Sequence, residues 1–291
     1  MNGFLLVDKA GGMTSHDVVA MARKKLNTKK VGHAGTLDPM ATGVLVLGVG
    51  IATRLLTYIT DGKKSYEGTI LLGSSTHTDD KDGDLISTAD KEVLAKTTNE
   101  SISAELAKFV GKIKQRPSSV SAIKIDGKSA HARVRAGEQV EIPERDVTID
   151  ENLVKDIRVN QTGIEVDISV TCSAGTYIRA IARDLGEQLM VGGHLISLRR
   201  TLVSPFSLES CHQIKDAELI PIVEVIEKLF LVRNLDFSES REILFGRSIV
   251  QNPQPGVVAA LDSQGAFIGL LENKLQGSQI VAAPILVKAS E

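Results

Sequence analysis

The order of helix-like and strand-like hydrophobic spacing along this chain limits the folds that it can adopt. Between residues 164 and 170, isoleucine and valine alternate with polar residues, which is typical of a strand with one buried face. Three stretches have apolar residues at helical spacing and predict helices: 14–26, 101–110 and 177–190. A short helix is also expected at 51–59. Three others predict short strands: 3–7, 44–49 and 65–72. Helices and strands do not alternate strictly, so we expect an α+β fold and not a doubly wound parallel sheet.

The first predicted helix has a defined start. Thr14 is followed three residues later by Asp17, which is the spacing of a capping box. We therefore expect the helix to begin directly after Thr14. Its buried face is expected to contain four apolar residues: Val18, Val19, Ala22 and Leu26.

The segment from His33 to Gly43 holds one carboxylate in a constrained backbone. Asp38 precedes Pro39, which disfavours the helical conformation at Asp38 and makes the chain extended there. Gly35 and Gly43 permit sharp turns on both sides. An acid held between two bends is one way to aim a carboxylate into a cleft, whereas a surface turn is the commoner fate of an Asp-Pro pair.

The net charge is −2, but the basic residues are unevenly distributed. Residues 18–37 contain five Lys or Arg and no acid, and residues 111–135 contain seven with one acid. We call these the first and second basic windows. Their members are Arg23, Lys24, Lys25, Lys29 and Lys30 in the first, and Lys112, Lys114, Arg116, Lys124, Lys128, Arg133 and Arg135 in the second. Such patches on an acidic body favour a polyanionic partner. Each window alone would also fit a solvated face.

Composition narrows the mode of recognition and the compartment. Aromatic residues make up 3% of the chain, so recognition of RNA is expected to depend on phosphates and shape more than on stacking of several bases. Cys172 and Cys211 are too few for a disulfide framework and lack metal-ligand spacing. No apolar run reaches membrane-spanning length, and the first residues lack the features of a signal peptide. We therefore expect a cytoplasmic protein without a membrane partner.

The acidic stretch 77–84 invites comparison with a calcium loop. Aligned on Gly83, the first and twelfth positions of an EF-hand would be Thr78 and Ala89, neither of which is acidic. We therefore expect no metal here. A solvated turn that becomes ordered near RNA is the simpler interpretation.

Several motifs occur in one order over roughly residues 1–205. They are Val7–Lys9 with Gly12–Ser15, Lys30–Leu45, Lys64–Tyr66, Thr78–Asp79 with Asp82 and Gly83, Cys172–Arg179 and Gly193–Arg200. In residues and order they resemble the motifs of the TruB family of tRNA pseudouridine synthases. The chain departs from the usual pattern at two positions: Ala10 replaces proline and Met40 replaces leucine. Neither residue carries a reactive group.

The resemblance implies an enzyme that isomerises uridine 55 in the T loop of tRNA to pseudouridine. The glycosidic bond is cleaved, the base turns, and C5 is joined to the ribose. This chemistry needs no cofactor, and the sequence contains no motif for one. The resemblance also implies a catalytic domain over residues 1–233, with a central mixed, mainly antiparallel sheet flanked by helices. The second basic window would be its RNA-binding insert.

The resemblance assigns three catalytic residues. Asp38 would start the reaction, either by covalent attack on the sugar or base or by assisting elimination. Arg179 would keep that carboxylate ionised through a forked ion pair. Tyr66 would pack against the uracil and help to remove the C5 proton, although a tyrosine that simply fills the core remains an alternative.

Four further residues are expected to bind the substrate. The target base must swing out of its loop to reach a pocket. By resemblance, His33 would fill the space that the base leaves, Leu198 would form the floor under the base, and Tyr177 would complete the wall. Lys9 would either support the Asp38 loop or contact phosphate.

From about Asn234 the chain contains short strand-like stretches and turns. Pro253 and Pro255 precede the strand-like stretch that begins at Val257. We interpret residues 234–291 as a small β-rich domain that resembles the PUA domain following TruB-like catalytic domains. A C-terminal extension of the main sheet is the alternative.

Two other functions remain open. A guide-dependent synthase of the dyskerin type has a similar catalytic motif, but it would require protein partners and guide RNA. The intact second basic window and the lack of lysine-rich tails favour a guide-independent enzyme without an obligatory protein partner. An RNA-folding role shares every sequence feature with the enzyme and could accompany catalysis.

Overall fold

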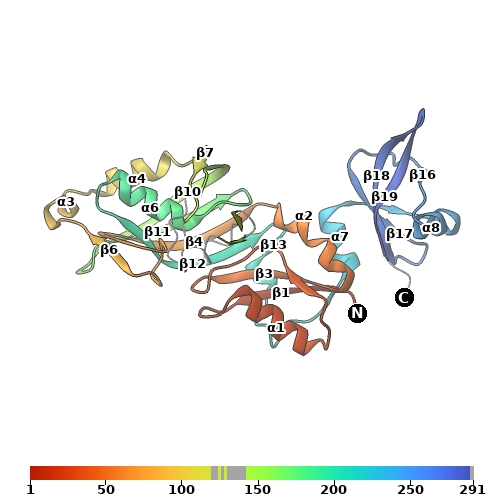
Figure 1. Ribbon diagram of the computed structural model, residues 1–291, viewed down its shortest axis with the longest axis horizontal. Coiled ribbons are helices and arrows are strands. Elements are labelled where there is room, and N and C mark those ends of the chain that lie inside the picture. Colours follow the sequence, from red (N-terminus) through yellow and green to blue (C-terminus); the bar gives the residue numbers. More distant parts are fainter. Residues whose placement is uncertain (119–123, 126–127, 130–141, 289–291) are drawn as a thin grey trace.

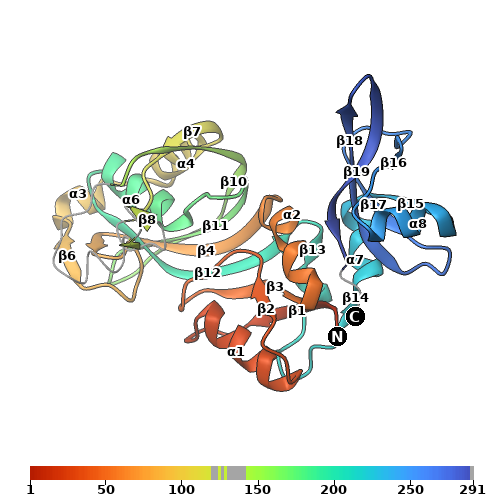
Figure 2. The same ribbon diagram turned by 45° about the vertical axis from the view of Figure 1, so that its right-hand side comes forward.

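The computed structural model describes residues 1–118, 124–125, 128–129 and 142–288. A large ten-stranded sheet and a separate five-stranded sheet make up most of the molecule. Figures 1 and 2 place α7 (Ile222–Leu229) between these two sheets. No helix in the described ranges is long and apolar enough to cross a membrane.

The ten-stranded sheet is mixed and mainly antiparallel, as predicted. Its main path begins with β14 (Ile220–Pro221), β1 (Gly3–Lys9), β3 (Thr42–Val49) and β12 (Gly193–Val203). It continues through β4 (Lys64–Leu72), β11 (Ile164–Cys172), β10 (Arg145–Val159) and β7 (Gly111–Gln115). Two short strands pair off this path, β2 (Val31–His33) with β3 and β13 (Phe206–Ser207) with β12. The β3–β12 pair is parallel, whereas its neighbours β1–β3 and β12–β4 are antiparallel.

The helices follow the predicted periodicity, with shifts of boundary that local capping explains. Helix α1 (Ser15–Lys25) starts after Thr14, and Thr14 and Asp17 form the expected capping box. Helix α4 (Asn99–Ala107) begins before the predicted start because Thr98, and not Ser101, is its N-cap residue. Helix α6 (Ile178–Gln188) follows β11. The predicted short helix at 51–59 is a 3₁₀ turn followed by α2 (Leu56–Thr60).

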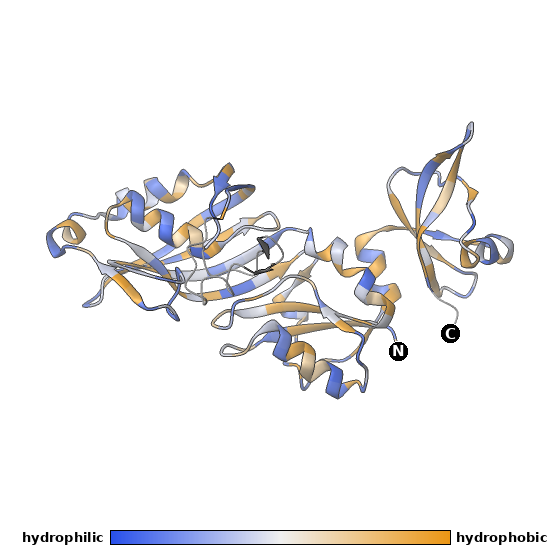
Figure 3. Ribbon diagram, in the orientation of Figure 1, coloured by the Kyte–Doolittle hydropathy of each residue, from blue (hydrophilic) through white to orange (hydrophobic). Residues whose placement is uncertain are grey.

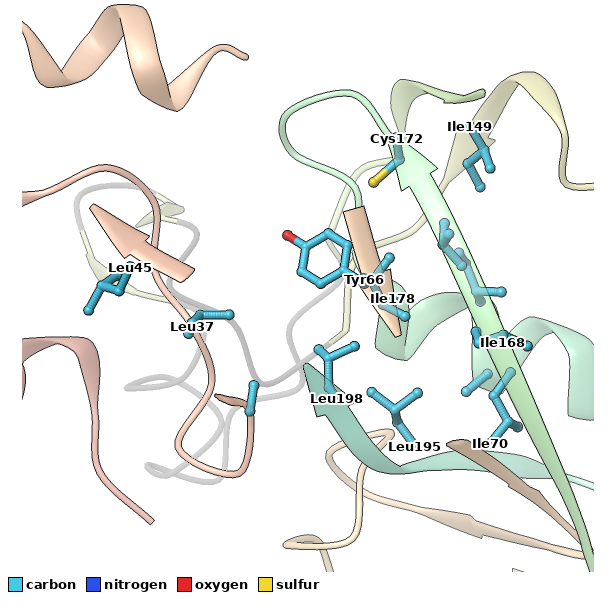
Figure 4. Packing of buried hydrophobic residues seen from close by; sticks show 14 of the residues in the cluster. Leu37, Leu45, Tyr66, Ile70, Ile149, Ile168, Cys172, Ile178, Leu195 and Leu198 are labelled. Atoms are coloured by element: carbon cyan, nitrogen blue, oxygen red, sulfur yellow. The ribbon is translucent and has the colours of Figure 1, made fainter. Parts of the chain in front are cut away.

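Alternation within the strands places apolar residues in the core. On β11 the residues at 164, 166, 168, 170 and 172 are buried, which confirms the predicted half-buried strand. Strands β1 and β3 are buried along almost their full length, and they stand out as hydrophobic in Figure 3. Figure 4 shows Ile70, Ile168 and Leu195 packed together beneath Tyr66 and Leu198. These residues belong to one core cluster that also includes residues of α1, α4 and α6.

A second core cluster joins α2 and α7 to the five-stranded sheet, through residues such as Ile59, Ile226 and Leu270. That sheet has the order β15 (Leu231–Asn234), β17 (Val257–Leu261), β18 (Phe267–Gln276), β19 (Gln279–Val287) and β16 (Ile249–Val250). With the short helix α8 (Phe237–Leu244) it forms a β-rich C-terminal unit, as predicted. The sheet is separate from the ten-stranded sheet, so it is not an extension of it. Its first strand begins slightly before the predicted boundary at residue 234.

Helix α6 ends in a conformation that does not suit its sequence. Met190, just after the C-cap residue Leu189, has φ of 59° and is 80% exposed. This left-handed position normally holds glycine, since a Cβ atom there costs about 1 kcal/mol. We expect Met190→Gly to raise the free energy of unfolding by about 1 kcal/mol in urea denaturation. Met190→Ala retains the Cβ atom, so an equal gain from that variant would contradict this explanation.

Candidate active site

A cavity of about 280 Å³ lies where the loop after β2, strand β4, the loop before α6 and strand β12 meet. Five residues with predicted roles line it: Asp38, Tyr66, Tyr177, Arg179 and Leu198. They come from segments that are distant in the sequence. Figure 4 shows Tyr66, Leu198 and Leu37 around this space. The fold therefore gathers most of the predicted site in one hollow.

The Asp38 loop has the constrained backbone that its sequence predicts. Gly35 and Gly43 have φ of 89° and 102°, in the left-handed region. A side chain at Gly43 would collide with the backbone of Arg200. Ser15 holds the loop from below, since its hydroxyl accepts from the Leu37 N–H at 2.9 Å and lies 3.3 Å from the Leu37 carbonyl. The loop is thus fixed at both bends and beside Asp38 itself.

Asp38 and Arg179 form a forked ion pair. The Nε atom of Arg179 lies 2.9 Å from one carboxylate oxygen of Asp38. The Nη2 atom donates to the other oxygen at 3.0 Å. Arg179 stands in the first turn of α6, and its side chain is almost fully buried. Two parallel charge-assisted bonds fix both the position and the orientation of the carboxylate.

Residues 77, 81, 82 and 84 of the acidic loop are exposed, but its centre is not a solvated turn, and this corrects our expectation. Asp79 and Asp80 are buried, and each contacts an arginine of α6. Asp80 lies 3.3 Å from Nη1 of Arg179, and Asp79 lies 3.3 Å from Nη1 of Arg183. The Thr78 carbonyl accepts a further bond from Nη1 of Arg179 at 2.8 Å. The expectation was wrong because a polar sequence gives no information about arginines that approach from a distant helix.

The environment of Asp38 acts on its pKa in opposite directions. Burial raises the pKa of the Asp38 carboxyl above its ordinary value, and the nearby charge of Asp80 adds to this effect. The guanidinium of Arg179 works against both, because an adjacent cation stabilises the ionised form. Arg179 is therefore the main group that keeps Asp38 negative in this buried site.

Asp80→Asn tests the second carboxylate. The loss of its charge lowers the pKa of Asp38, so the acid limb of the pH–rate profile should move to lower pH. The weaker hold on Arg179 should also reduce the maximal single-turnover rate by roughly 10-fold, the effect of one lost bond to a charged group. The exposed neighbour Asp82→Asn is the control. A shift of the acid limb to higher pH in Asp80→Asn would contradict this account.

The apolar and aromatic walls follow the predicted arrangement. Tyr66 and Leu198 lie on the neighbouring strands β4 and β12, and both are nearly buried. Burial raises the pKa of Tyr66, so its phenol stays protonated at neutral pH. Tyr177 precedes α6, and the guanidinium of Arg145 stacks over its ring at 5.5 Å. Because Tyr66 stays protonated, it is better suited to pack against a nucleobase than to act as an ionised general base.

Lys9 supports the Asp38 loop and does not face a phosphate. Its ammonium group donates to the carbonyls of Ala10, Met13 and Pro39 at 2.9, 2.7 and 3.3 Å. Lys9 is only 1% exposed, so the alternative of direct contact with phosphate is wrong. Its bond to the residue after Asp38 ties the N-terminal turn to the Asp38 loop.

Two other buried cations in the cavity lining were not singled out from the sequence. Arg200 is 1% exposed and donates to the carbonyls of Val44 and Gly35 at 2.8 and 3.2 Å. Lys64 donates to the carbonyls of Thr60 and Gly62, both at 2.6 Å. Burial, with a contribution from Arg200, lowers the pKa of Lys64 to about 8. Both residues stand inside motifs that we noted, but their sequence neighbours gave no sign that they would be buried.

His33 lies at the end of β2, outside the cavity lining. Its ring meets the ring of His16 edge-on, with centroids 5.4 Å apart. Burial lowers the pKa of His33, so the imidazole is neutral at neutral pH. The structure thus separates His33 from the residues around Asp38, and its predicted stacking role remains a prediction.

Part of the first basic window is used inside the protein. Lys25 donates to the carbonyls of Ile214, Lys215 and Ala217, and Arg23 donates to the Val31 carbonyl. All five members of this window are nevertheless exposed, including Lys24, Lys29 and Lys30.

In the second window, Lys112 and Lys114 share one exposed face of β7, and Arg116 is exposed beyond its end. The side chains of Lys124 and Lys128 lie outside the described part of the structure, as do Arg133 and Arg135. Exposed members of both windows are thus available for RNA.

The described residues contain no group of three or more His, Cys, Asp or Glu side chains that could hold a metal ion. The polar groups that line the cavity are one carboxylate, two tyrosines, threonines and basic side chains. Such a set suits chemistry at a carboxylate whose charge is balanced by an arginine.

Two solved structures share this architecture over 98% of the chain and 84% of their own. One is an H/ACA RNP bound to a substrate RNA containing 2′-deoxyuridine, with a TM-score of 0.70 at 22% identity. The other is a Cbf5-Nop10-Gar1 complex, with a TM-score of 0.70 at 23% identity. At this level of identity the likeness shows the fold alone.

Family models and relatives of higher sequence identity show the family of this chain. The model of the TruB family pseudouridylate synthase N-terminal domain matches residues 23–178. The model of the tRNA pseudouridylate synthase B C-terminal domain matches residues 179–229. A tRNA pseudouridine synthase B of Corynebacterium diphtheriae is 47% identical over 96% of this chain and 94% of its own. A relative of the same name from Rhodococcus jostii is 48% identical over 94% and 90%. The chain belongs to the TruB family of pseudouridine synthases.

Proposed function

We propose that this protein converts uridine 55 in the T loop of tRNA to pseudouridine, without guide RNA or a protein partner. The single observation that carries the proposal is the forked pair between Asp38 and Arg179 at the edge of an enclosed cavity. The names of the relatives, which refer to tRNA, support the substrate class. The position within tRNA rests on the resemblance of the motifs.

The geometry supports a reaction on one extruded base. A cavity of about 280 Å³ has the volume of roughly nine water molecules in the liquid, which is room for one pyrimidine. Tyr66 and Leu198 supply its apolar walls. Swinging the uridine out of its loop costs a few kcal/mol of stacking, which contacts with the RNA backbone must offset. The exposed lysines of the basic windows supply positive charge for such contacts.

In the proposed reaction, the bond between N1 and C1′ breaks and a bond between C5 and C1′ forms. The proton that leaves C5 is balanced by the proton that N1 gains, so the product is an isomer of the substrate. Asp38 starts the reaction by attack on the nucleoside or by assisting elimination, and Arg179 keeps the Asp38 carboxylate ionised. A carboxylate can act in this way only when it is ionised and shielded from water.

Guide independence and compartment complete the proposal. The exposed lysines and arginine on both basic windows give the chain its own means of holding RNA, as a guide-independent enzyme requires. The two cysteines are free, which fits the reducing cytoplasm as the compartment.

The test is the purified protein alone with unmodified tRNA transcripts. Conversion should occur at position 55 and at no other uridine, as shown by carbodiimide mapping. A transcript with cytidine at position 55 is the control and should remain unmodified. Conversion at other positions, or a requirement for added RNA or protein, would contradict the proposal.

A further inference from the structure

Residues 115–118, at the end of β7 and inside the second basic window, are bonded to the supports of Arg179. Gln115 ends β7 and is 1% exposed. Its side-chain amide donates to the Tyr177 carbonyl at 3.0 Å and accepts from the N–H of the same residue at 2.8 Å. One side chain therefore holds both backbone polar groups of Tyr177.

Tyr177 is the N-cap residue of α6, and its own side chain makes no capping hydrogen bond. Its carbonyl also accepts from the N–H of Ala180, which belongs to the first turn of the helix. Gln115 thus fixes the start of α6 from a separate strand. At most helix starts the side chain of the N-cap residue itself makes such hydrogen bonds. Because Arg179 belongs to that first turn, the helix start determines where its guanidinium meets Asp38.

Two further contacts come from the same short segment. The Ser118 hydroxyl, which is fully buried, donates to the Thr78 carbonyl at 3.1 Å. That carbonyl also accepts from Nη1 of Arg179 at 2.8 Å. The Arg116 carbonyl accepts from Nη2 of Arg183 at 2.8 Å, one turn further along α6. The segment 115–118 therefore contacts the helix start, the next arginine of the helix and the carbonyl that holds Arg179.

We propose that Gln115 is a positioning residue that sets Arg179 against Asp38, and that Ser118 assists by holding the Thr78 carbonyl. Neither side chain lines the cavity, so both act through other residues. This segment lies inside the second basic window. The positioning role concerns the site of the proposed function and rests on it.

The first test is Gln115→Glu. The variant keeps the acceptor for the Tyr177 N–H but replaces the donor to the Tyr177 carbonyl by a carboxylate oxygen. The single-turnover rate on a T stem-loop RNA should fall at least about 10-fold, while the Kd for that RNA changes less than about threefold. Gln188→Glu makes the same chemical change at the exposed end of α6, and it should leave the rate unchanged.

The second readout needs no RNA. NMR titration of the Asp38 carboxyl carbon in the free protein follows its ionisation directly. If Gln115→Glu displaces Arg179, the midpoint moves to higher pH, because Arg179 is the cation that lowers it. Gln188→Glu should keep the wild-type midpoint.

An unchanged midpoint and an unchanged rate per folded molecule in Gln115→Glu would overturn the proposal. A wild-type protein that converts no uridine in any tRNA would refute the proposed function instead, and the midpoint would still decide the positioning role. If Gln115→Glu does not fold, Ser118→Ala takes its place, since it removes one bond and leaves the helix start intact. We expect a rate loss of roughly threefold to 10-fold and a midpoint shift in the same direction. Wild-type values for both would overturn the proposal.

Discussion

Replacing Asp38 with asparagine is expected to abolish turnover while the protein still binds tRNA. The amide has nearly the shape of the carboxylate, so the loop held by Ser15 and Lys9 should keep its conformation. A neutral amide cannot act as the nucleophile or base that the reaction requires. The loss of such a group lowers the rate on the order of 10³-fold or more.

The measurement is the single-turnover rate on unmodified tRNA, with the Kd from filter binding. We expect the Kd of Asp38→Asn to stay within about threefold of wild type, because exposed basic residues outside the cavity supply most of the binding energy. Asp216→Asn is the matched control, because Asp216 is exposed and distant from Asp38 in the sequence, and this variant should be fully active. Substantial turnover by Asp38→Asn would remove Asp38 from the mechanism.

Arg179→Met should have the second largest effect, and it should act on stability as well as rate. The substitution leaves the half-buried carboxylate of Asp38 and the buried carboxylate of Asp80 without their shared cation. Removing one partner of a buried pair typically costs about 3–5 kcal/mol, which urea denaturation will detect. The rate at neutral pH should fall on the order of 10²-fold or more, since a misplaced and protonated Asp38 cannot act.

The pH dependence of the rate distinguishes a protonated Asp38 from a misplaced one. Arg179 lowers the pKa of Asp38 against the effect of burial, so its loss should move the acid limb of the pH–rate profile to higher pH. This shift is opposite to the shift expected for Asp80→Asn. Arg158→Met is the control, because Arg158 pairs with three carboxylates at the surface, where such pairs contribute about 1 kcal/mol or less. An acid limb at its wild-type position in Arg179→Met would show that Arg179 does not tune Asp38.

Features that depend on neighbouring residues were predictable from the sequence. The capping box at Thr14 depends on a residue three positions away, and the alternation on β11 depends on every second residue. Both patterns are set by the local geometry of helices and strands, so they persist whatever the rest of the chain does. Helix α4 started earlier than predicted because Thr98 is its N-cap residue and Ser101, three positions later, completes a capping box with it.

Features that depend on distant contacts were not predictable by spacing. Asp38 and Arg179 are 141 positions apart, and only the resemblance to a family suggested that they meet. Lys25 was expected to face RNA, and nothing in the sequence indicated that its ammonium group also donates to three carbonyls near residue 215. The hydrogen bonds between Gln115 and Tyr177 join residues 62 positions apart, and no motif that we noted predicted them.

The sequence by itself determined the α+β class, the constrained loop around Asp38 and the family, because each is written in residues close together or in an ordered set of motifs. Only the tertiary structure decided which charges are buried and which partner each one has. Asp80 shows why: its carboxylate sits in a polar stretch that resembles a surface turn, and it becomes part of the site only because α6 packs Arg179 against it. Burial and pairing depend on which segments the fold brings together, and a carboxylate's own neighbours in the chain do not contain that information.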